Sequence, residues 1–227
     1  MPQPLFDTDA LIAKFQTAGA KGGAQLRKAA CDATLQALQG RELTLKNIRG
    51  ALKSVSEAAS NGLARNAMPG VDPEALLSKA VAGMDDALLK AVEANRAALA
   101  QFVAQGADLR EKHLKKAIDD LEKFEDTLFG ALKKAADGAS APVAGAWNQV
   151  LEKMQSVGSV SGAQASATAS QMLEQTQTAM RASRAAGLRA AHALAEGYAA
   201  MVSGVLVGMT EALQQRDTTA AGSRKKG

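Results

Sequence analysis

Leucine recurs at intervals of eleven residues in the middle of the chain. In the stretch LSKAVAGMDDALLKAVEANRAAL it occupies positions 77, 88 and 99. Eleven residues make three helical turns of about 3.67 residues each, close to the roughly 3.6 of an α-helix, so an apolar stripe with this repeat runs almost straight. A seven-residue repeat would instead wind the stripe into a left-handed supercoil. The spacing therefore predicts a long amphipathic helix with a straight apolar face.

Neighbouring lines of residues with the same spacing extend this apolar face. Positions 81, 92 and 103 are valine, and positions 102 and 124 on another line are phenylalanine. Charged Arg110 and Glu125 interrupt the lines. The residues expected to contact a partner or an apolar surface are Leu77, Val81, Leu88, Val92, Leu99, Phe102, Val103, Leu121, Phe124 and Leu132.

Two interpretations of this stripe remain open. An apolar stripe is most often the side of a helix that packs into a core, here against another helix of the chain or against a second copy. A straight stripe also suits a helix that lies on a broad apolar surface, because its apolar side does not wind away from that surface. Both hold if a hairpin that is closed in solution opens on a surface.

The hydrophobic pattern places the first long helix over residues 73–136. Asp72 is a suitable N-cap, Pro73 suits the first helical position, and the next turn signal is DGASAP at residues 137–142. A second long helix is predicted from there to about residue 215. Its segment 154–173 has no charged residue, and its glycines leave room for a break near Gly158 or Gly162.

Two long helices joined by one short turn are expected to pack as an elongated antiparallel hairpin. The first helix alone would be roughly 96 Å long, whereas a compact globule of this chain length is roughly 45 Å across. The predicted organisation is short N-terminal helices over residues 1–70, the helical hairpin over residues 71–216, and a disordered basic tail over residues 217–227.

The composition also indicates an all-α fold. Alanine accounts for almost half of the apolar residues, and only 3% of all residues are aromatic. Alanine has the highest helix propensity, whereas the β-branched and aromatic residues that favour strands are scarce. Because alanine buries little surface, such helices pack closely along their length, as in a coiled coil, or are completed by a partner.

Charges of both signs alternate along most of the chain, whose formal net charge is +4. The tail GSRKKG carries Arg224, Lys225 and Lys226, which could contact phosphate or an acidic surface. Three charges bind only weakly, so nucleic acid is not expected as a partner.

The expected location is the cytoplasm. The lone Cys31 suits a reducing compartment, and the N-terminus lacks the apolar segment of a secretory signal. The most apolar run, residues 197–209, is too short to cross a bilayer, so no transmembrane segment is expected.

The residues that catalysis or metal binding would need form no familiar pattern. His192 and Glu196 share a predicted helix face, but two ligands are too few for a metal site. No motif supplies the partners that would activate Cys31 as a nucleophile. The stretch GAKGG at residues 19–23 lacks the strand and the residue order of a phosphate-binding loop. We therefore expect a non-enzymatic protein without a cofactor or a metal.

Three features occur together over residues 73–227: the alanine-rich stretch LLKAVEANRAALAQFVAQG, the uncharged stretch SGAQASATASQ and the small basic tail. In this combination the chain resembles the phasins, the helical proteins that coat polyhydroxyalkanoate storage granules in bacteria. The N-terminal 70 residues and the scarcity of phenylalanine depart from that family. The resemblance implies a cytoplasmic protein that adsorbs on an apolar polymer and self-associates, and it carries over no catalytic residue.

These observations predict an amphipathic helical protein that coats an apolar surface or scaffolds an assembly, with a storage granule as one candidate surface. The expected partners are a second copy of the chain and an apolar polymer or lipid-like surface. The alternative is a rod-like module that binds another protein through the same stripe.

Overall fold

The computed structural model describes residues 7–39, 41, 43–65, 72–105 and 112–182. These residues form eight α-helices and no strand, which confirms the expected all-α fold. The helices are α1 (Thr8–Ala20), α2 (Gly23–Leu38), α3 (Leu45–Ala64), α4 (Pro73–Ala104), α5 (Lys112–Glu122), α6 (Phe124–Asp137), α7 (Ala141–Val157) and α8 (Val160–Ala182). In α8 the burial of side chains is described as far as residue 175.

The helices α1, α3 and α4 each begin at a side chain that accepts hydrogen bonds from the first turn. Asp7 caps α1 and Thr44 caps α3 in this way. Asp72 accepts the backbone N–H of Glu74 at 2.9 Å, and Pro73 occupies the first helical position of α4, as the sequence predicts. These short-range bonds satisfy N–H groups that have no partner inside the helix, so they place the helix starts locally.

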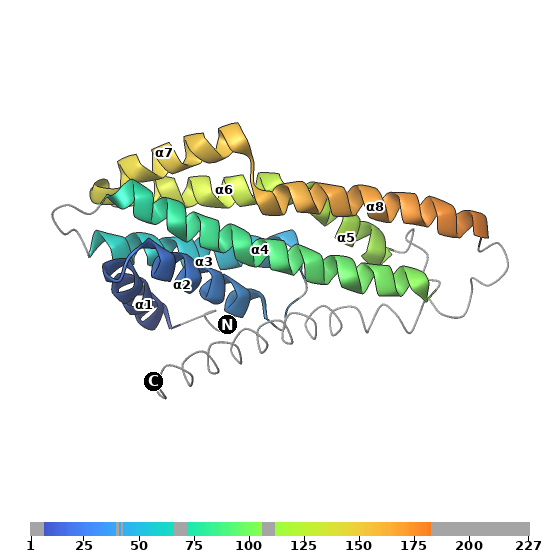
Figure 1. Cartoon of the computed structure of the whole chain (residues 1–227), viewed down its shortest axis with the longest axis horizontal. Helices are drawn as coiled ribbons and strands as arrows, with labels where there is room; N and C mark the ends of the chain where they lie inside the picture. Colours follow the sequence, from blue (N-terminus) through green and yellow to red (C-terminus); the bar gives the residue numbers. More distant parts are fainter. Residues whose placement is uncertain (1–6, 40, 42, 66–71, 106–111, 183–227) are drawn as a thin grey trace, which may run out of the picture.

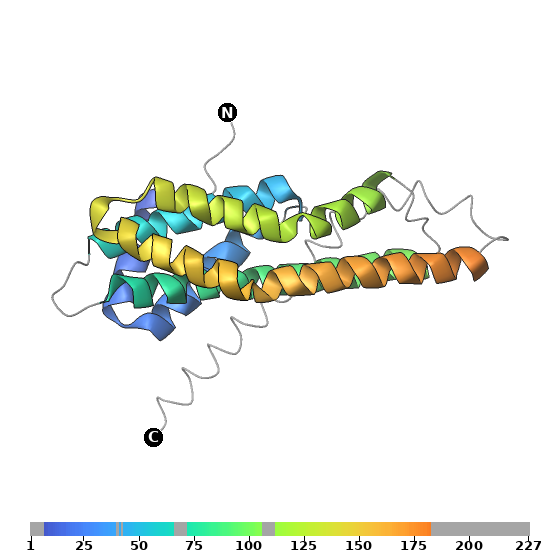
Figure 2. The ribbon, with the colours of Figure 1, turned by 90° about the horizontal axis from the view of Figure 1, so that it is seen from above.

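Three passes of the chain run along the longest axis of the molecule (Figures 1 and 2). The first pass is α4. The second is α5 followed by α6, which runs in the opposite direction, and the third is α7 followed by α8, which runs parallel to α4. α3, α7 and α8 each contact both α4 and α6 and therefore link the first pass to the second.

The helices α1, α2 and α3 cover one end of these passes (Figure 1). α2 packs against α4, α3 packs against α6, and α1 packs against α2 and α3. Their buried side chains belong to the same continuous hydrophobic core as those of the later helices. The N-terminal helices that the sequence sets apart as residues 1–70 are thus part of one core with the helices that follow.

The prediction of a single helix over residues 73–136 is wrong. α4 ends at Ala104, and the chain then returns as α5 and α6, which are separated at Lys123. A continuous rod would leave its apolar stripe uncovered over much of its length. Folding the rod back lets the apolar side chains of α4, α5 and α6 enter one core, which removes them from water.

The second long helix is interrupted at Gly158, where the sequence leaves room for a break. α7 ends at Val157, and α8 begins at Val160 after Gly158 adopts a positive φ of 79°. The turn predicted at residues 137–142 is present between α6 and α7. The part of the predicted helix beyond residue 182 lies outside the described residues.

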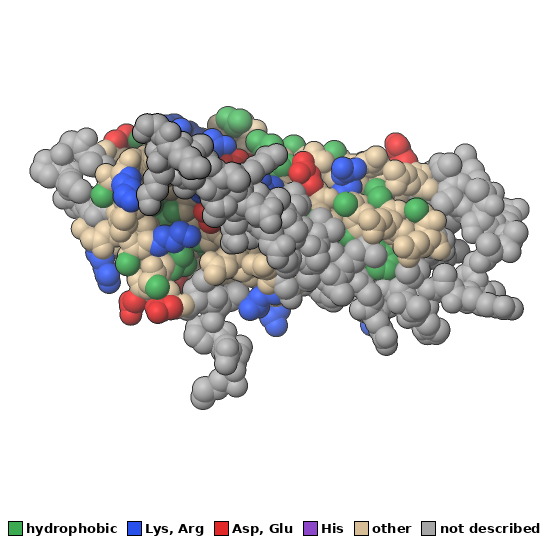
Figure 3. All heavy atoms as spheres, turned by 60° about the horizontal axis from the view of Figure 1, so that its bottom comes forward, with side chains coloured by type: hydrophobic (Ala, Val, Ile, Leu, Met, Phe, Trp, Pro, Cys, Tyr) green, Lys and Arg blue, Asp and Glu red, His purple; other side chains and the backbone are tan. Residues whose placement is uncertain are grey.

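The outer surface carries charges of both signs. On the face shown in Figure 3, basic and acidic side chains are interspersed, with hydrophobic side chains scattered among them. None of the helices in the described ranges combines the length and the apolar character that a membrane crossing requires.

Candidate functional site

The apolar stripe that the sequence singles out lies inside the fold. The buried members are Leu77, Val81, Leu88, Val92, Leu99 and Phe102 on α4, Leu121 on α5, and Phe124 and Leu132 on α6, while Val103 is partly buried against the core. Positions 77, 88 and 99 are buried together on α4, as the elevenfold spacing predicts. The stripe can meet a partner or a surface only if a covering helix moves away, so its role in binding stays a prediction.

The helix α8 covers α4 with mostly small side chains. It packs along α4 and α5. Its buried side chains within residues 160–175 are Ser161, Ala165, Thr168, Ala169 and Met172. Met172 is the only large apolar side chain in that set, whereas α2 buries Leu26, Leu35 and Leu38. Within residues 160–175, α8 therefore buries fewer large apolar side chains than α2.

The chain passes from α7 to α8 through a polar segment, residues 158–162, which we call the joint. The Ser159 hydroxyl accepts the backbone N–H of Gly162 at 3.0 Å and so caps α8 locally. The backbone N–H of Ser159 also donates to Oε1 of Glu125 in α6 at 3.0 Å. A Cβ at Gly162 would lie 2.8 Å from the carboxylate carbon of Glu125, so a larger residue there would displace this side chain.

A second carboxylate, from α4, holds the other side of the joint. The backbone N–H groups of Val160 and Ser161 donate to Oδ2 and Oδ1 of Asp85 at 3.0 and 3.2 Å. The Ser161 hydroxyl donates to the same carboxylate. The first N–H groups of a helix lack partners within the helix and form the positive end of its dipole, so carboxylates at this position stabilise the contact.

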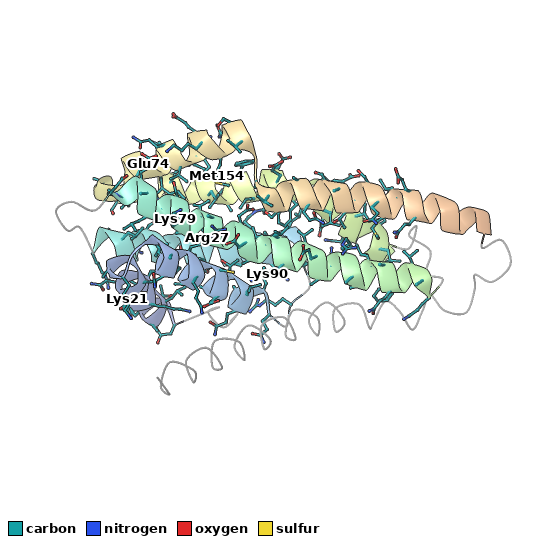
Figure 4. All side chains as sticks on the ribbon, in the orientation of Figure 1. Lys21, Arg27, Glu74, Lys79, Lys90 and Met154 are labelled. Atoms are coloured by element: carbon teal, nitrogen blue, oxygen red, sulfur yellow. The ribbon has the colours of Figure 1, made fainter. Side chains whose placement is uncertain are left out.

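The helix α7 is anchored by a buried tryptophan and by an ion pair to α4. Trp147 is fully buried, and its Nε1 donates to the hydroxyl of Ser60 in α3 at 2.8 Å. Near the end of α7, Lys153 forms an ion pair with Glu74 of α4, and this hydrogen bond and charge raise the pKa of Lys153 above its ordinary value. Figure 4 shows Glu74 and the neighbouring Met154 at the same end of the molecule.

Polar groups also follow the seam between α2 and α4, where Figure 4 shows Arg27 and Lys90. Arg27 donates to Asp86 through Nε at 2.6 Å and through a terminal nitrogen at 2.8 Å. The hydrogen bond to Asp86 raises the pKa of Arg27 above its ordinary value. The side chains of Arg27 and Asp86 are 48% and 37% exposed, so solvent weakens this ion pair, and it orients the two helices more than it stabilises them.

The thiol of Cys31 lies in the same seam, with Lys90 Nζ 3.9 Å away. Burial raises the pKa of Cys31, and the nearby charge of Lys90 opposes this shift only in part. A nucleophilic cysteine needs the opposite shift, because the thiolate is the reactive form. Within the described residues, no three His, Cys, Asp or Glu side chains converge as metal ligands. The absence of catalysis and of a metal in the whole chain stays a prediction.

Sequence reasoning missed the exposed apolar residues of α7 and α8. Val157, Val160 and Leu173 are 86%, 63% and 46% exposed, and they are the exposed large hydrophobic residues among the described side chains. All three lie in the uncharged segment 154–173, whose lack of charge is the sequence feature that could have indicated an exposed apolar surface. The predicted tail contacts Arg224, Lys225 and Lys226 lie outside the described residues.

A protein-family model matches residues 1–215 and thus includes every described helix. The chain belongs to this family. It is described as a family of unknown function, DUF6781. No curated protein and no solved structure matches the chain. Membership of DUF6781 therefore assigns neither a partner nor an activity to the chain.

Proposed function

We propose that this protein is a non-catalytic amphipathic helical protein of the cytoplasm that adsorbs on an apolar surface. In this proposal α8 swings away from α4, and the part of the apolar stripe that α8 covers, beyond Asp85 on α4, then contacts the surface. One observation carries the proposal: in the described part of α8, only one large apolar side chain, Met172, holds the helix in the core.

The described part of α8, residues 160–175, contributes little free energy from apolar burial. Burying a methionine side chain stabilises a protein by about 1.5–3 kcal/mol, and each additional methyl-sized group contributes about 0.8 kcal/mol. Met172, Ala165 and Ala169 together therefore contribute on the order of 3–5 kcal/mol. An apolar surface that replaces α8 covers the stripe on α4 again. The main free-energy cost of opening on a surface is therefore the lost burial of the apolar side chains of α8. Proteins open locally at such free energies without unfolding globally.

The form of α4 supports adsorption on a broad surface. The helix has 32 residues, which corresponds to about 48 Å at a rise of about 1.5 Å per residue. Its stripe stays on one side because the apolar residues recur at eleven. The passes of the chain along one long axis in Figure 1 are consistent with an elongated, hairpin-like bundle that can open along its length.

The resemblance to the phasins favours a polyhydroxyalkanoate granule as the surface. The uncharged stretch that contributes to this resemblance, residues 161–171, lies in the first half of α8. A helix without charges can lie close to an apolar polymer without the free-energy cost of removing charges from water. Self-association on the granule is part of the same proposal.

The test measures adsorption and opening together. Spin labels are attached to Lys46→Cys in α3 and Ser170→Cys in α8, both exposed positions, in a Cys31→Ala background. We expect the protein to co-sediment with polyhydroxybutyrate or polystyrene beads and the label separation to lengthen only on the beads. A control pair at Lys46 and Asp126, on α3 and α6, should keep its separation. Failure to adsorb, or adsorption with an unchanged α3–α8 separation, would contradict the proposal.

A second candidate function is binding of a second copy of this chain in solution through the outer side of α7 and α8. The exposure of Val157, Val160 and Leu173 favours it, because these side chains gain burial without any opening. The substitutions Val157→Ser and Val160→Ser should then abolish self-association in sedimentation velocity and leave bead adsorption unchanged. Loss of bead adsorption with retained self-association would reject this second function.

A further inference from the structure

We infer that the joint is a locked hinge: Gly158 is the pivot, and Asp85 and Glu125 form a lock that keeps α8 against α4. This inference rests on the proposed opening of α8 and adds the residues that control it. Figure 1 shows α7 stepping into α8 at this point, with α8 extending along α4 and α5 beyond the end of α7.

The pivot lies between α7, whose buried side chains include a tryptophan, and α8, whose described buried side chains are mostly small. On one side, α7 buries Trp147, Val143 and Val150. On the other side, the described part of α8 buries Met172 and otherwise small residues. The connecting Gly158 has φ 79° and ψ −177°. Residues with a Cβ rarely adopt this conformation, whereas glycine adopts it readily. Motion is therefore expected at the joint and not within either helix.

The carboxylates have a role beyond capping. The Ser159 hydroxyl already caps α8 by accepting the N–H of Gly162. Asp85 is 75 residues before Val160 in the sequence, and Glu125 is 34 residues before Ser159. Bonds over such separations fix the start of α8 to α4 and α6, whereas a local cap only supports its helical conformation.

The position of the lock amplifies its effect. All its bonds reach Ser159, Val160 or Ser161, directly beside the pivot. The 23 residues of α8 form a lever of about 35 Å at a rise of about 1.5 Å per residue. A rotation at the joint breaks the bonds to Asp85 and Glu125 and moves the distant end of α8 off α4.

The first experiment measures amide hydrogen exchange in solution, without any apolar surface. Asp85→Ala and Glu125→Ala should each raise exchange in α8 by about tenfold, the factor that corresponds to about 1.4 kcal/mol. Exchange in α2 and α7 should remain unchanged, and so should the helicity measured by circular dichroism. Asp85→Asn retains an oxygen acceptor and should have a smaller effect. Asp126→Ala, an exposed carboxylate in the first turn of α6, is the matched control.

A disulfide between α4 and the start of α8 provides a second test. It strengthens the contact instead of weakening it. Because the side chains of Asp85 and Ser161 are in contact, Asp85→Cys with Ser161→Cys can form a disulfide in the Cys31→Ala background. Oxidation should slow exchange in α8 by at least tenfold relative to the reduced form, and bead adsorption should fall in parallel.

The outcomes separate the lock from the proposed function. Faster α8 exchange with unchanged bead adsorption would support the lock and reject adsorption by opening. Unchanged α8 exchange in both alanine variants, or equal acceleration in α2, α7 and α8, would overturn the lock. In that case the label experiment would still test the proposed function. A longer α3–α8 label separation on beads, with Asp85 and Glu125 unchanged, would support it.

Discussion

The backbones of α2 and α4 touch at Arg27 and Gly83. A Cβ built on Gly83 would lie 2.9 Å from the carbonyl carbon of Arg27, closer still to its oxygen, and 3.0 Å from the Cβ of Ala30. One turn further along α4, Asp86 pairs with the side chain of Arg27. The glycine thus lets two parallel helices approach to backbone contact, which an alanine-rich interface favours.

We expect Gly83→Ala to destabilise the protein by about 1–3 kcal/mol or more. Alanine is the better helix former by about 1 kcal/mol, but the atoms that it would strike belong to the backbone of α2 and cannot rotate away. Urea denaturation measures the difference. Gly130→Ala is the matched control, because a Cβ there meets no atom within 4 Å and should stabilise α6 by up to about 1 kcal/mol. Similar effects of the two substitutions would mean that α2 and α4 are not in close contact.

Trp147→Phe is expected to lower the free energy of unfolding by about 1–3 kcal/mol. The substitution removes the indole N–H that donates to Ser60 and leaves a gap beside a buried hydroxyl. Thermal unfolding followed by circular dichroism provides the measurement. A wild-type Tm in this variant would show that α7 is not anchored through the indole. The intact indole, the sole tryptophan of the chain, should have a blue-shifted emission that moves to the red on unfolding.

The stability should decrease with rising pH above the ordinary pKa of a thiol because of Cys31. Burial raises the pKa of this thiol in the folded chain, so the unfolded chain releases the proton at a lower pH than the folded chain. In that interval the unfolded state binds fewer protons, and stability falls as the pH rises. Comparing urea midpoints of the wild type and Cys31→Ala from neutral to alkaline pH isolates this effect. Parallel pH profiles would contradict it.

Gly158→Ala is expected to destabilise the start of α8 by about 1–3 kcal/mol, because φ is 79° at this residue. Hydrogen exchange should therefore accelerate in α8 and remain unchanged in α2. Gly145→Ala in α7 serves as the control: a Cβ at that position meets no atom within 4 Å, so the substitution should be neutral or stabilising. Protection of α8 in Gly158→Ala equal to that of the wild type would exclude a conformational requirement for glycine at the joint.

Much of the local structure could be predicted from the sequence. The start of α4 at Asp72 and Pro73, the shared face of Leu77, Leu88 and Leu99, and the interruption near Gly158 all follow from interactions within a few turns. The stripe was also recognisable as apolar, but its pattern alone did not distinguish a core from an adsorbing face, because both require the same residues on one side of a helix.

By itself, the sequence determined that this protein is helical, where several helices begin and which sides of them are apolar, because propensity, capping and periodicity act over a few residues. Only the tertiary structure decided that the chain reverses after Ala104, that Gly83 meets the backbone of α2, and that Asp85 and Glu125 converge on the start of α8. The contacts of Asp85 and Glu125 join residues 34 to 76 positions apart, and no local pattern encodes which helix face will find which partner. That choice depends on how all the faces together remove the most apolar surface from water while keeping their polar groups hydrogen-bonded.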